Sequence, residues 1–444
     1  MIKDKKIREI IKESWSVGWP TAFIMFYEFM IGFTDVYVAS KFGKEAQAAY
    51  GIAFQLYFIF IIIGIALSVG VVSVVARLFS SDKPEIFKTA VSSSVATATL
   101  SGLIFGICGV LFSKDIIQVL DLPAVVKVYA APFATLYSLA FLFDYILMST
   151  NSIMRSCNMI KKSLWIMSLV CVLNIILDFV LAFHTPLGLR GIAIATVISL
   201  SIGAAISLYY MWKLVGRFSF SLTIVKNIFK ISWPSGVLQA LWQLGALVLF
   251  LIISHLPKYN VEIMAAFTNG LKIESAIFLP AFAFNMACAV VVGNLIGKND
   301  KEYAFRGGII TALLGIVIVS ILTILVMLNA RRIASFLSND IIVVNESVRY
   351  IYIALLSEPI MAWGVILGGG LNGAGDTKSV MIIATLAIWL VRIPLCYILG
   401  IYFCLGATAI WWTMNISVTL QAIFITVRYY RKKWVSQAQM SLEV

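Results

Sequence analysis

The sequence predicts an all-α polytopic membrane protein with twelve transmembrane helices in two pseudo-symmetric six-helix bundles. Of its 444 residues, 61% are hydrophobic and only 12% are charged, whereas a soluble globular chain carries roughly 25% charged residues. This composition excludes a water-soluble enzyme, a coiled coil and a disordered protein. Each membrane-spanning helix needs about 20 apolar residues, so a chain of this length has room for about twelve spans with their connections.

Uninterrupted apolar stretches predict the helices in order. The expected spans are 16–40, 48–76, 89–112, 128–152, 163–183, 191–212, 232–254, 263–296, 307–329, 347–371, 379–403 and 406–427. An even number of spans places both termini on one side of the membrane. Of the 34 Lys and Arg residues, 23 fall on that side, and nine fall in the opposite loops or, for Arg349, at the adjoining end of a span, a bias that is typical of the cytoplasm. We therefore expect a multi-pass protein of the cell (inner) membrane with both termini cytoplasmic.

Five segments follow from these spans. The N-terminus, 1–15, is basic and amphipathic, lacks the features of a cleavable signal, and is expected on the cytoplasmic membrane surface. The other segments are an N-lobe at 16–212, a cytoplasmic linker at 213–231, a C-lobe at 232–430 and a cytoplasmic tail at 431–444. The six cysteines are scattered without a C-x-x-C pair, so we expect buried apolar thiols rather than metal or redox sites.

The two halves of the chain repeat each other weakly. Four patterns of the first half recur in the same order in the second: Gly18-Trp19-Pro20 as Ser232-Trp233-Pro234, Phe87 as Phe305, Lys162-Ser163 as Lys378-Ser379, and Gly191 as Gly406. Because six spans separate the copies, both copies have the same orientation. Such a parallel repeat about an axis along the membrane normal is typical of secondary transporters; the alternative is coincidence.

Ionisable side chains inside spans are costly, at about 2.5–3.5 kcal/mol each on insertion scales. They are Glu28, Asp35, Asp144 and Asp178 in the first half and Lys272, Glu274, Glu358 and Arg392 in the second. Asp35 and Asp178 are expected at a similar depth in the outer half of the N-lobe. Asn174 lies one turn below Asp178 on the same helix face, and Thr196 lies near the outer end of the following span.

Two neighbouring carboxylates in a low dielectric cannot both remain ionised without a cation. Either one takes up a proton, or the pair binds a monovalent metal ion such as Na+ with oxygen ligands from Asn174 and Thr196. An ion-coupled antiporter needs this chemistry, whereas the alternative is polar packing between helices. No cofactor is expected besides H+ or Na+ as the coupling ion.

The other buried charges have less specific interpretations. Asp144 and Glu358 are separated by the same offset as the two Trp-Pro pairs of the repeat, and are candidates to line a central cavity. Glu28 and Glu274 are further candidates for contact with a cation or a substrate. Arg392 is expected to anchor structure by pairing with a carboxylate or with carbonyl groups.

Enzyme motifs give no support for catalysis. The run Gly293–Lys298 is one residue too short for a P-loop, and the sequence has no H-E-x-x-H or G-x-S-x-G. The glycine-rich run Gly368–Gly375 is expected to end a span or to form a flexible joint. We therefore predict no enzyme, no ATP-driven mechanism and no nucleic-acid partner.

With these residues placed, the chain resembles the multidrug and toxic compound extrusion (MATE) transporters over nearly its whole length. The resemblance rests on Pro20 followed by Asp35, Asn174-Ile-Ile-Leu-Asp178, Gly188-x-x-Gly191-x-Ala193-x-Ala195-Thr196, Leu371-Asn-Gly-Ala-Gly-Asp376-Thr-Lys378 and Arg392-Ile-Pro394. It implies two six-helix bundles around a V-shaped cavity. It also implies export of amphipathic, often cationic, organic compounds against inward flow of H+ or Na+.

The resemblance also implies particular site residues. The family's N-lobe cation site falls on Asp35, Asn174, Asp178 and Thr196, and Pro20 falls on the proline at which the first span bends. One branch of the family places a key acid in span 7, but this chain has none there, so coupling through the N-lobe is favoured. In a second departure, Glu28 stands where some relatives have a neutral amide.

Other functions remain as alternatives at this stage. A lipid-linked oligosaccharide or lipid flippase of the same superfamily predicts a cavity rich in Arg and Lys, whereas the interior charges here are mostly acidic. A membrane enzyme or a structural protein is disfavoured by the missing catalytic motifs and by the repeat. The sequence leaves open the substrate and the choice between H+ and Na+, and it requires no more than a monomer.

Overall fold

The computed structural model describes residues 2–435, whose long segments are helices. The first half contains α1 (Ile2–Ser40), α2 (Lys44–Phe79), α3 (Pro84–Val119), α4 (Ala124–Ser138), α5 (Ala140–Ser156), α6 (Ile160–Phe183) and α7 (Arg190–Val215). The second half contains α8 (Leu222–Ser254), α9 (Asn260–Gly297), α10 (Lys301–Leu328), α11 (Ala330–Leu337), α12 (Ile341–Ala354), α13 (Glu358–Gly373), α14 (Thr377–Leu386), α15 (Ile393–Tyr397) and α16 (Gly406–Tyr430). Short helical turns η1 (Leu355–Ser357) and η2 (Ala387–Arg392) join their neighbours into longer helices, and η3 (Ile398–Tyr402) extends α15.

These helices confirm the all-α membrane fold with about twelve spans. Within the described residues, eleven continuous helices are long and apolar enough to cross a bilayer. Two of them are composite, because η1 joins α12 to α13 and η2 joins α14 to α15. The twelfth candidate span is the pair α4 and α5, which bend by 44° where they meet.

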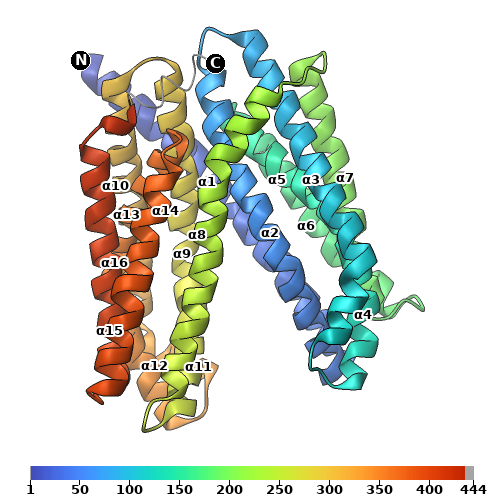
Figure 1. The fold of residues 1–444 in the computed structure, drawn as a ribbon, viewed down its shortest axis with the longest axis vertical. Helices are drawn as coiled ribbons and strands as arrows, with labels where there is room; N and C mark the ends of the chain where they lie inside the picture. The colour runs from blue at the N-terminus through green and yellow to red at the C-terminus, as the bar shows by residue number, and fades with distance from the viewer. Residues whose placement is uncertain (1, 436–444) are drawn as a thin grey trace. The chain divides into compact units, whose positions relative to one another are not determined.

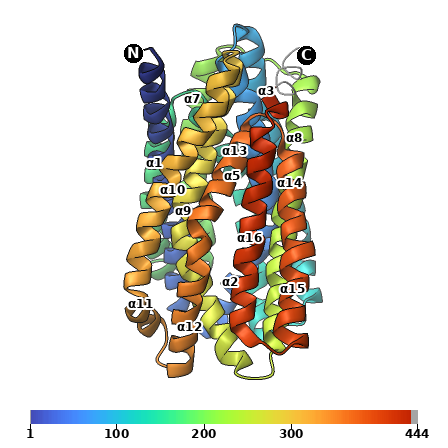
Figure 2. The same ribbon diagram turned by 90° about the vertical axis from the view of Figure 1, so that its left-hand side faces the viewer.

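The helices form two compact units. Among the described residues, the N-terminal unit covers Phe23–Gly236, and the C-terminal unit takes those up to Ala22 and those from Val237 onward. In the N-terminal unit, α6 packs along α7, and α3 packs along α4 and α5. In the C-terminal unit, α9 packs along α10 and α13, and α16 packs on α13 (Figure 1 and Figure 2).

The unit boundaries fall inside two helices at equivalent positions of the repeat. α1 changes units after Ala22, and α8 changes units after Gly236. Each boundary lies two positions beyond the proline of a Trp-Pro pair, Pro20 in α1 and Pro234 in α8. Each of these helices therefore contributes to both units, and the lobe limits drawn from the sequence, 16–212 and 232–430, stay a prediction.

Residues of the predicted N-terminal segment 1–15 contact the C-terminal unit, while its predicted place at the cytoplasmic membrane surface stays a prediction. α1 continues from it into the first span without a break. Ser14 is fully buried, and its Oγ lies 2.7 Å from Thr311 Oγ1. Lys6 Nζ donates a hydrogen bond of 2.9 Å to Asp300. These polar partners on α10 and the loop before it explain why the segment is held by protein.

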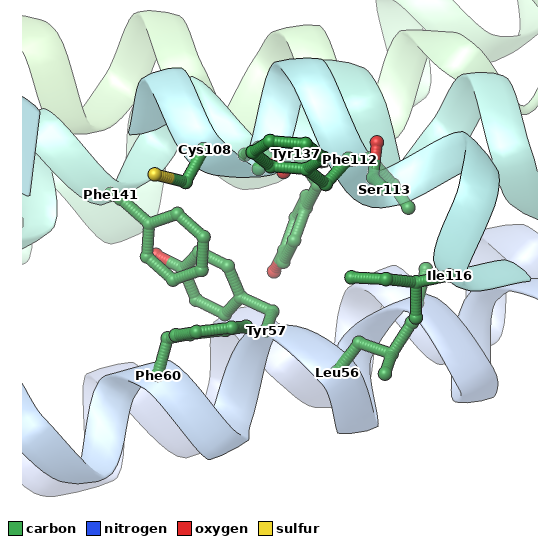
Figure 3. A pocket seen from close by; sticks show the side chains of 13 residues that line it. Leu56, Tyr57, Phe60, Cys108, Phe112, Ser113, Ile116, Tyr137 and Phe141 are labelled. Carbon is green, nitrogen blue, oxygen red and sulfur yellow. Dashed lines mark hydrogen bonds between the residues drawn. The ribbon is translucent and has the colours of Figure 1, made fainter. Parts of the chain in front are cut away.

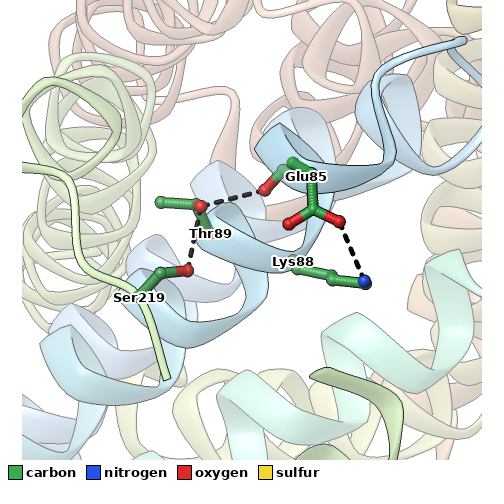
Figure 4. A network of polar contacts seen from close by, with 4 residues as sticks. All are labelled: Glu85, Lys88, Thr89 and Ser219. Atoms are coloured by element: carbon green, nitrogen blue, oxygen red, sulfur yellow. Dashed lines mark hydrogen bonds and ion pairs between the residues drawn. The ribbon is translucent and has the colours of Figure 1, made fainter. Parts of the chain in front are cut away.

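Within the predicted linker 213–231, α8 begins at Leu222. The chain before α8 is fastened to α3 of the same unit. Ser219 Oγ lies 2.9 Å from Thr89 Oγ1, and Thr89 also donates to the Glu85 carbonyl (Figure 4). Hydroxyl contacts of this kind fix the approach of the chain to α8.

The tail is described only in part, since residues 436–444 of the predicted segment 431–444 lie outside the described residues. Trp434 is fully buried. Its indole N–H donates a hydrogen bond of 2.8 Å to the Tyr429 carbonyl. The described start of the tail is therefore packed against the end of α16.

The glycine-rich run near the end of α13 is chiefly a helix-packing surface. A Cβ at Gly369 would collide with the backbone carbonyl of Asn285, and a Cβ at Gly373 with that of Ala289. Small residues four positions apart let two membrane helices approach closely, and here they bring α13 against α9. Gly375 has a φ of 90°, a left-handed conformation that ends the helix as expected.

Candidate functional site

The four residues predicted as a cation site meet inside the N-terminal unit. Asp35 comes from the far half of α1, Asn174 and Asp178 come from α6, and Thr196 comes from α7. The first three are 0% exposed and Thr196 is 4% exposed. Asn174 Nδ2 donates to Thr196 Oγ1 at 3.3 Å, and the two carboxyl groups are close enough to interact. The structure brings these residues together, while their role stays a prediction.

A tight α6–α7 hairpin creates this arrangement. A Cβ at Gly191 would come within 2.6 Å of the Leu181 backbone, so glycine is needed where the two helices are closest. Asn174 and Asp178 are four positions apart and therefore share one face of α6. The close approach at Gly191 brings that face against the first turns of α7, where Thr196 lies.

Four buried oxygen atoms in this group have no hydrogen-bond partner among the described residues. They are Asp35 Oδ1, Asn174 Oδ1 and both carboxyl oxygens of Asp178. An unsatisfied buried polar group costs about 1–3 kcal/mol, and more when it is charged. Repulsion between two carboxylates adds to this cost. A proton or a small cation would remove both penalties, since it neutralises charge and occupies lone pairs.

Two tyrosines complete the group, and the sequence analysis did not identify them. Tyr50 on α2 donates from its hydroxyl to Asp35 Oδ2 at 3.2 Å. Tyr137 on α4 interacts with Thr196 and lies within electrostatic range of Asp35 and Asp178. Both tyrosines are at most 4% exposed. Nothing in a single sequence separates them from tyrosines that merely fill a core.

The other acids of the N-terminal unit form a neighbouring contact. Asp144 on α5 accepts a hydrogen bond of 2.7 Å from the Tyr57 hydroxyl. Glu28 on α1 is exposed, and it lies within electrostatic range of Asp144 and Arg155. An exposed carboxylate beside a second acid can attract an organic cation, and this role of Glu28 and Asp144 stays a prediction.

A second buried acidic cluster lies in the C-terminal unit. The Tyr350 hydroxyl donates to Glu274 Oε1 at 2.8 Å, and Glu274 interacts electrostatically with Glu358. Both acids are at most 8% exposed, and Glu358 Oε2 has no hydrogen-bond partner among the described residues. Arg392 lies near Glu274 and donates to Ser417 Oγ at 2.8 Å. The expected pairing of Arg392 with a carboxylate or with carbonyl groups stays a prediction.

Pro20 lies inside α1, two positions before the point where α1 passes between units. Proline has no N–H, and its ring crowds the carbonyl four residues earlier. The hydrogen-bond ladder of α1 is therefore interrupted close to the unit boundary. The predicted bend at this residue stays a prediction.

A family model described as MatE matches residues 20–180 and 234–398. The two matches begin at Pro20 and Pro234, the equivalent positions of the repeat. The chain belongs to the MATE family. It is therefore a multi-pass membrane transporter and not an enzyme.

Relatives of this MATE protein match it over most of its length. NorM of Thermotoga maritima, described as a probable multidrug resistance protein, is 23% identical and the match covers 99% of this chain and 96% of the relative. YoeA of Bacillus subtilis, described in the same way, is 23% identical over 88% of this chain and 87% of its own. YisQ of Bacillus subtilis, described as an uncharacterized transporter, is 21% identical over 95% of each.

Solved structures share the MATE fold. A transporter of the MOP superfamily from Pyrococcus furiosus has a TM-score of 0.88 at 18% identity, with 97% of each chain covered. A MATE structure described as a bent conformation has a TM-score of 0.88 at 18% identity, covering 99% of each chain. A MATE structure described as a straight conformation has a TM-score of 0.88 at 19% identity, covering 97% of each.

The two units of this MATE chain differ in chemistry although they repeat in fold. When the two Trp-Pro pairs are aligned, the position equivalent to Asp35 is Leu249, which is 2% exposed. α8 contains no Asp or Glu along its whole length, Leu222–Ser254. The buried acids of the C-terminal unit instead come from α9 and α13. The repeat therefore preserves packing positions but not the acid of α1.

Proposed function

We propose that this MATE protein exports amphipathic, cationic organic compounds in exchange for H+ or Na+ that enters the cell. The coupling ion binds in the N-terminal unit at Asp35, Asn174, Asp178 and Thr196. Relatives described as multidrug resistance proteins support the substrate class. The protein acts as a monomer in the cell (inner) membrane with both termini in the cytoplasm.

One observation carries the ion-binding proposal. Two fully buried carboxyl groups, Asp35 and Asp178, interact with each other and leave three of their four oxygens without a hydrogen-bond partner among the described residues. Such a pair is stable only when a proton or a cation reduces its charge. A site of this kind responds directly to the concentration of its ion.

Ion binding has a direct mechanical route through α1. Asp35 lies in the part of α1 that belongs to the N-terminal unit, whereas Pro20 lies in the part that belongs to the C-terminal unit. Occupation of the site draws Asp35 and Asp178 together and changes the preferred path of α1. The ion favours one conformation and the substrate favours the other, so each one displaces its competitor.

The acids outside this site contact the substrate. Glu28 is exposed and lies near Asp144, so this pair attracts organic cations. Glu274 and Glu358 perform the same task in the C-terminal unit, where Tyr350 holds the first of them. Aromatic side chains add cation–π attraction, which is worth about 0.5–2 kcal/mol.

Counter-transport in proteoliposomes tests the proposal. Purified protein is reconstituted with a fluorescent organic cation such as ethidium, and Na+ and pH gradients are imposed separately. Wild-type protein should move ethidium against its gradient when one of the two ions flows inward. Asp35→Asn and Asp178→Asn should abolish this movement without loss of folded protein.

Asp115→Asn is the matched control, because Asp115 is an exposed acid on α3, a helix that contributes none of the four site residues. It should transport like wild type. Normal ion-driven transport by Asp35→Asn would rule out the proposed site. Movement of a fluorescent phospholipid between leaflets, with no ethidium transport by wild type, would instead favour the flippase alternative.

A further inference from the structure

A cavity of about 130 Å³ lies between α2, α3 and the α4–α5 pair of the N-terminal unit (Figure 3). Thirteen residues line it: Ala53, Leu56, Tyr57, Phe60, Cys108, Gly109, Phe112, Ser113, Ile116, Ala134, Tyr137, Ser138 and Phe141. No Asp, Glu, Lys, Arg or His is among them. The cavity therefore has no group that can recognise a charged ligand by ion pairing.

Three hydroxyl groups that border the cavity already have partners. Ser138 Oγ donates to the Ala134 carbonyl at 2.7 Å, and the Tyr57 hydroxyl donates to Asp144 at 2.7 Å. Ser113 Oγ lies 2.9 Å from Thr135 Oγ1. A trapped water needs two to four polar partners, whereas an apolar cavity of about 150 Å³ stays dry and accepts a benzene-sized group. This cavity fits a hydrocarbon ligand.

The mouth of the cavity is continuous with a surface suited to lipid. Cys108, Phe112 and Ile116 of α3 line the cavity yet are exposed. The exposure of Cys108, like that of Cys404, corrects the expectation of buried thiols. The three residues are four positions apart and so share one face of α3. Beside them runs an exposed apolar stripe on α3, which faces acyl chains in a membrane protein: Leu100, Leu103, Ile104, Ile107 and Leu111.

The inner wall of the cavity is shared with the candidate cation site. Tyr137 lines the cavity and also interacts with Thr196. Tyr57 lies beside it, with 4.5 Å between the two ring centroids, and Tyr57 also stacks on Phe141 with 4.4 Å between the centroids. Whatever fills the cavity therefore presses on a ring whose hydroxyl end belongs to the ion site.

We propose that this cavity binds one acyl chain of a bilayer lipid, which enters between Cys108, Phe112 and Ile116 and packs against Tyr57 and Tyr137. The acyl chain completes the packing of a wall that protein side chains leave open. This is favourable because atoms that line an empty void lose their dispersion contacts. It also restricts the position of Tyr137 beside the ion site. A cationic transport substrate is disfavoured as the occupant, because no carboxylate lines the cavity.

Photo-crosslinking tests the occupant. Protein in nanodiscs of phosphatidylcholine that carries a diazirine on one acyl chain is irradiated, and crosslinked residues are mapped by mass spectrometry. Lining residues such as Leu56 and Ala134, which are partly or fully buried, should be labelled alongside the open stripe at Ile104. Labelling confined to the open stripe would overturn the proposal.

Cys108→Phe places a ring in the mouth and should reduce labelling of Leu56 and Ala134 to background, with Ile104 unchanged. Ala53→Leu fills the cavity from α2 and gives a second, independent variant with the same expectation. Leu103→Phe is the matched control, since it enlarges a side chain on α3 outside the lining; its labelling should equal wild type. Unchanged labelling of the lining in both filled variants would contradict lipid entry. Competition by ethidium for the labelled lining would point to a substrate instead.

The link to the ion site rests on the proposed function and is tested separately. In proteoliposomes, Cys108→Phe should shift the half-saturating concentration of the coupling ion, whereas Leu103→Phe should not. An unchanged value in Cys108→Phe would disprove the link through Tyr137. Crosslinking does not require transport. The labelling of the cavity lining therefore still tests lipid binding if the proposed transport function fails.

Discussion

The Tyr50 hydroxyl donates a hydrogen bond of 3.2 Å to the Asp35 carboxyl. A hydrogen bond to a charged group is worth about 1.5–3 kcal/mol. In Tyr50→Phe, Asp35 loses this donor and should bind its cation more tightly, because the cation no longer competes with the hydroxyl. A change of about 1.4 kcal/mol corresponds to about tenfold. The half-saturating concentration of the coupling ion in the transport assay should fall by about that factor.

Tyr145→Phe is the control for this variant. The Tyr145 hydroxyl donates to the Phe60 carbonyl at 2.6 Å, so the variant loses a buried hydrogen bond away from the ion site. Its thermal stability should decrease while its ion dependence stays at the wild-type value. Equal ion dependence of Tyr50→Phe and wild type would show that the tyrosine only fills space.

At the residue scale, sequence reasoning found the acids but not the tyrosines. Asp35 and Asp178 stand out because charge inside a span is costly, and helical spacing then adds Asn174. Tyr50 and Tyr137 carry no such signal, since aromatic side chains are common in membrane cores. Their contacts depend on how α2 and α4 pack, and packing partners are not encoded in local periodicity.

At the element scale, the packing of α13 on α9 makes a clear prediction. Gly369→Ala and Gly373→Ala each place a Cβ against a backbone carbonyl of α9, which cannot move like a side chain. Overpacking of this kind costs about 1–3 kcal/mol. The melting temperature of the detergent-purified protein should therefore fall for both variants, as measured by a fluorescence thermal shift.

Gly368→Ala provides the matched control on the same helix. A Cβ at Gly368 would lie 3.6 Å from Val380 Cγ1, an ordinary van der Waals contact. Its melting temperature should equal that of wild type or exceed it slightly, because alanine favours helix more than glycine does. A loss equal to that of Gly369→Ala would mean that helix flexibility, and not close packing, explains the glycine run.

The elements themselves were predictable because hydropathy and length fix a span. The α4–α5 bend was not predicted. The start of α8 at Leu222 was not predicted either, since the stretch before Trp233 contains Lys226 and Lys230 and is polar for a span. Those lysines lie on the first turns of α8. Charged residues at helix ends in a membrane protein look like loop residues in a hydropathy pattern.

At the scale of the whole molecule, the charge bias predicts orientation. Both termini should lie in the cytoplasm, because 23 of the 34 basic residues fall on their side of the predicted spans, as cytoplasmic loops require. A fluorescent protein fused to the C-terminus should be bright, and alkaline phosphatase at the same place should be inactive. Phosphatase fused after Asp121, in the loop between α3 and α4, should be active. The reverse pattern would place the termini outside.

The division of α1 and α8 between the units was beyond sequence reasoning. The Trp-Pro repeat gave the equivalent positions, but contact partners decide which unit holds each half of a helix. Ser14 on α1 contacts Thr311 of the C-terminal unit, and Ser219, shortly before α8, contacts Thr89 of the N-terminal unit. The partners are far apart in the chain, and no local pattern links them.

The unequal chemistry of the two units predicts a division of labour. Leu249 stands at the repeat position of Asp35, so the C-terminal unit lacks the ion-site acid of α1 while keeping Glu274 and Glu358. In detergent, ethidium bound to wild type should be displaced by Na+ or by acid. Asp35→Asn should still bind ethidium but resist displacement, because its coupling ion no longer competes.

Glu274→Gln should show the opposite behaviour. It removes a buried negative charge near the proposed substrate path, so ethidium should bind more weakly by about tenfold, which is the effect of about 1.4 kcal/mol. The ion should still displace the remaining ethidium, because Asp35 and Asp178 are intact. If Glu274→Gln abolished displacement and Asp35→Asn left it unchanged, the coupling site would belong to the C-terminal unit. Whether the ion still displaces ethidium from Asp35→Asn and from Glu274→Gln therefore decides which unit binds the ion.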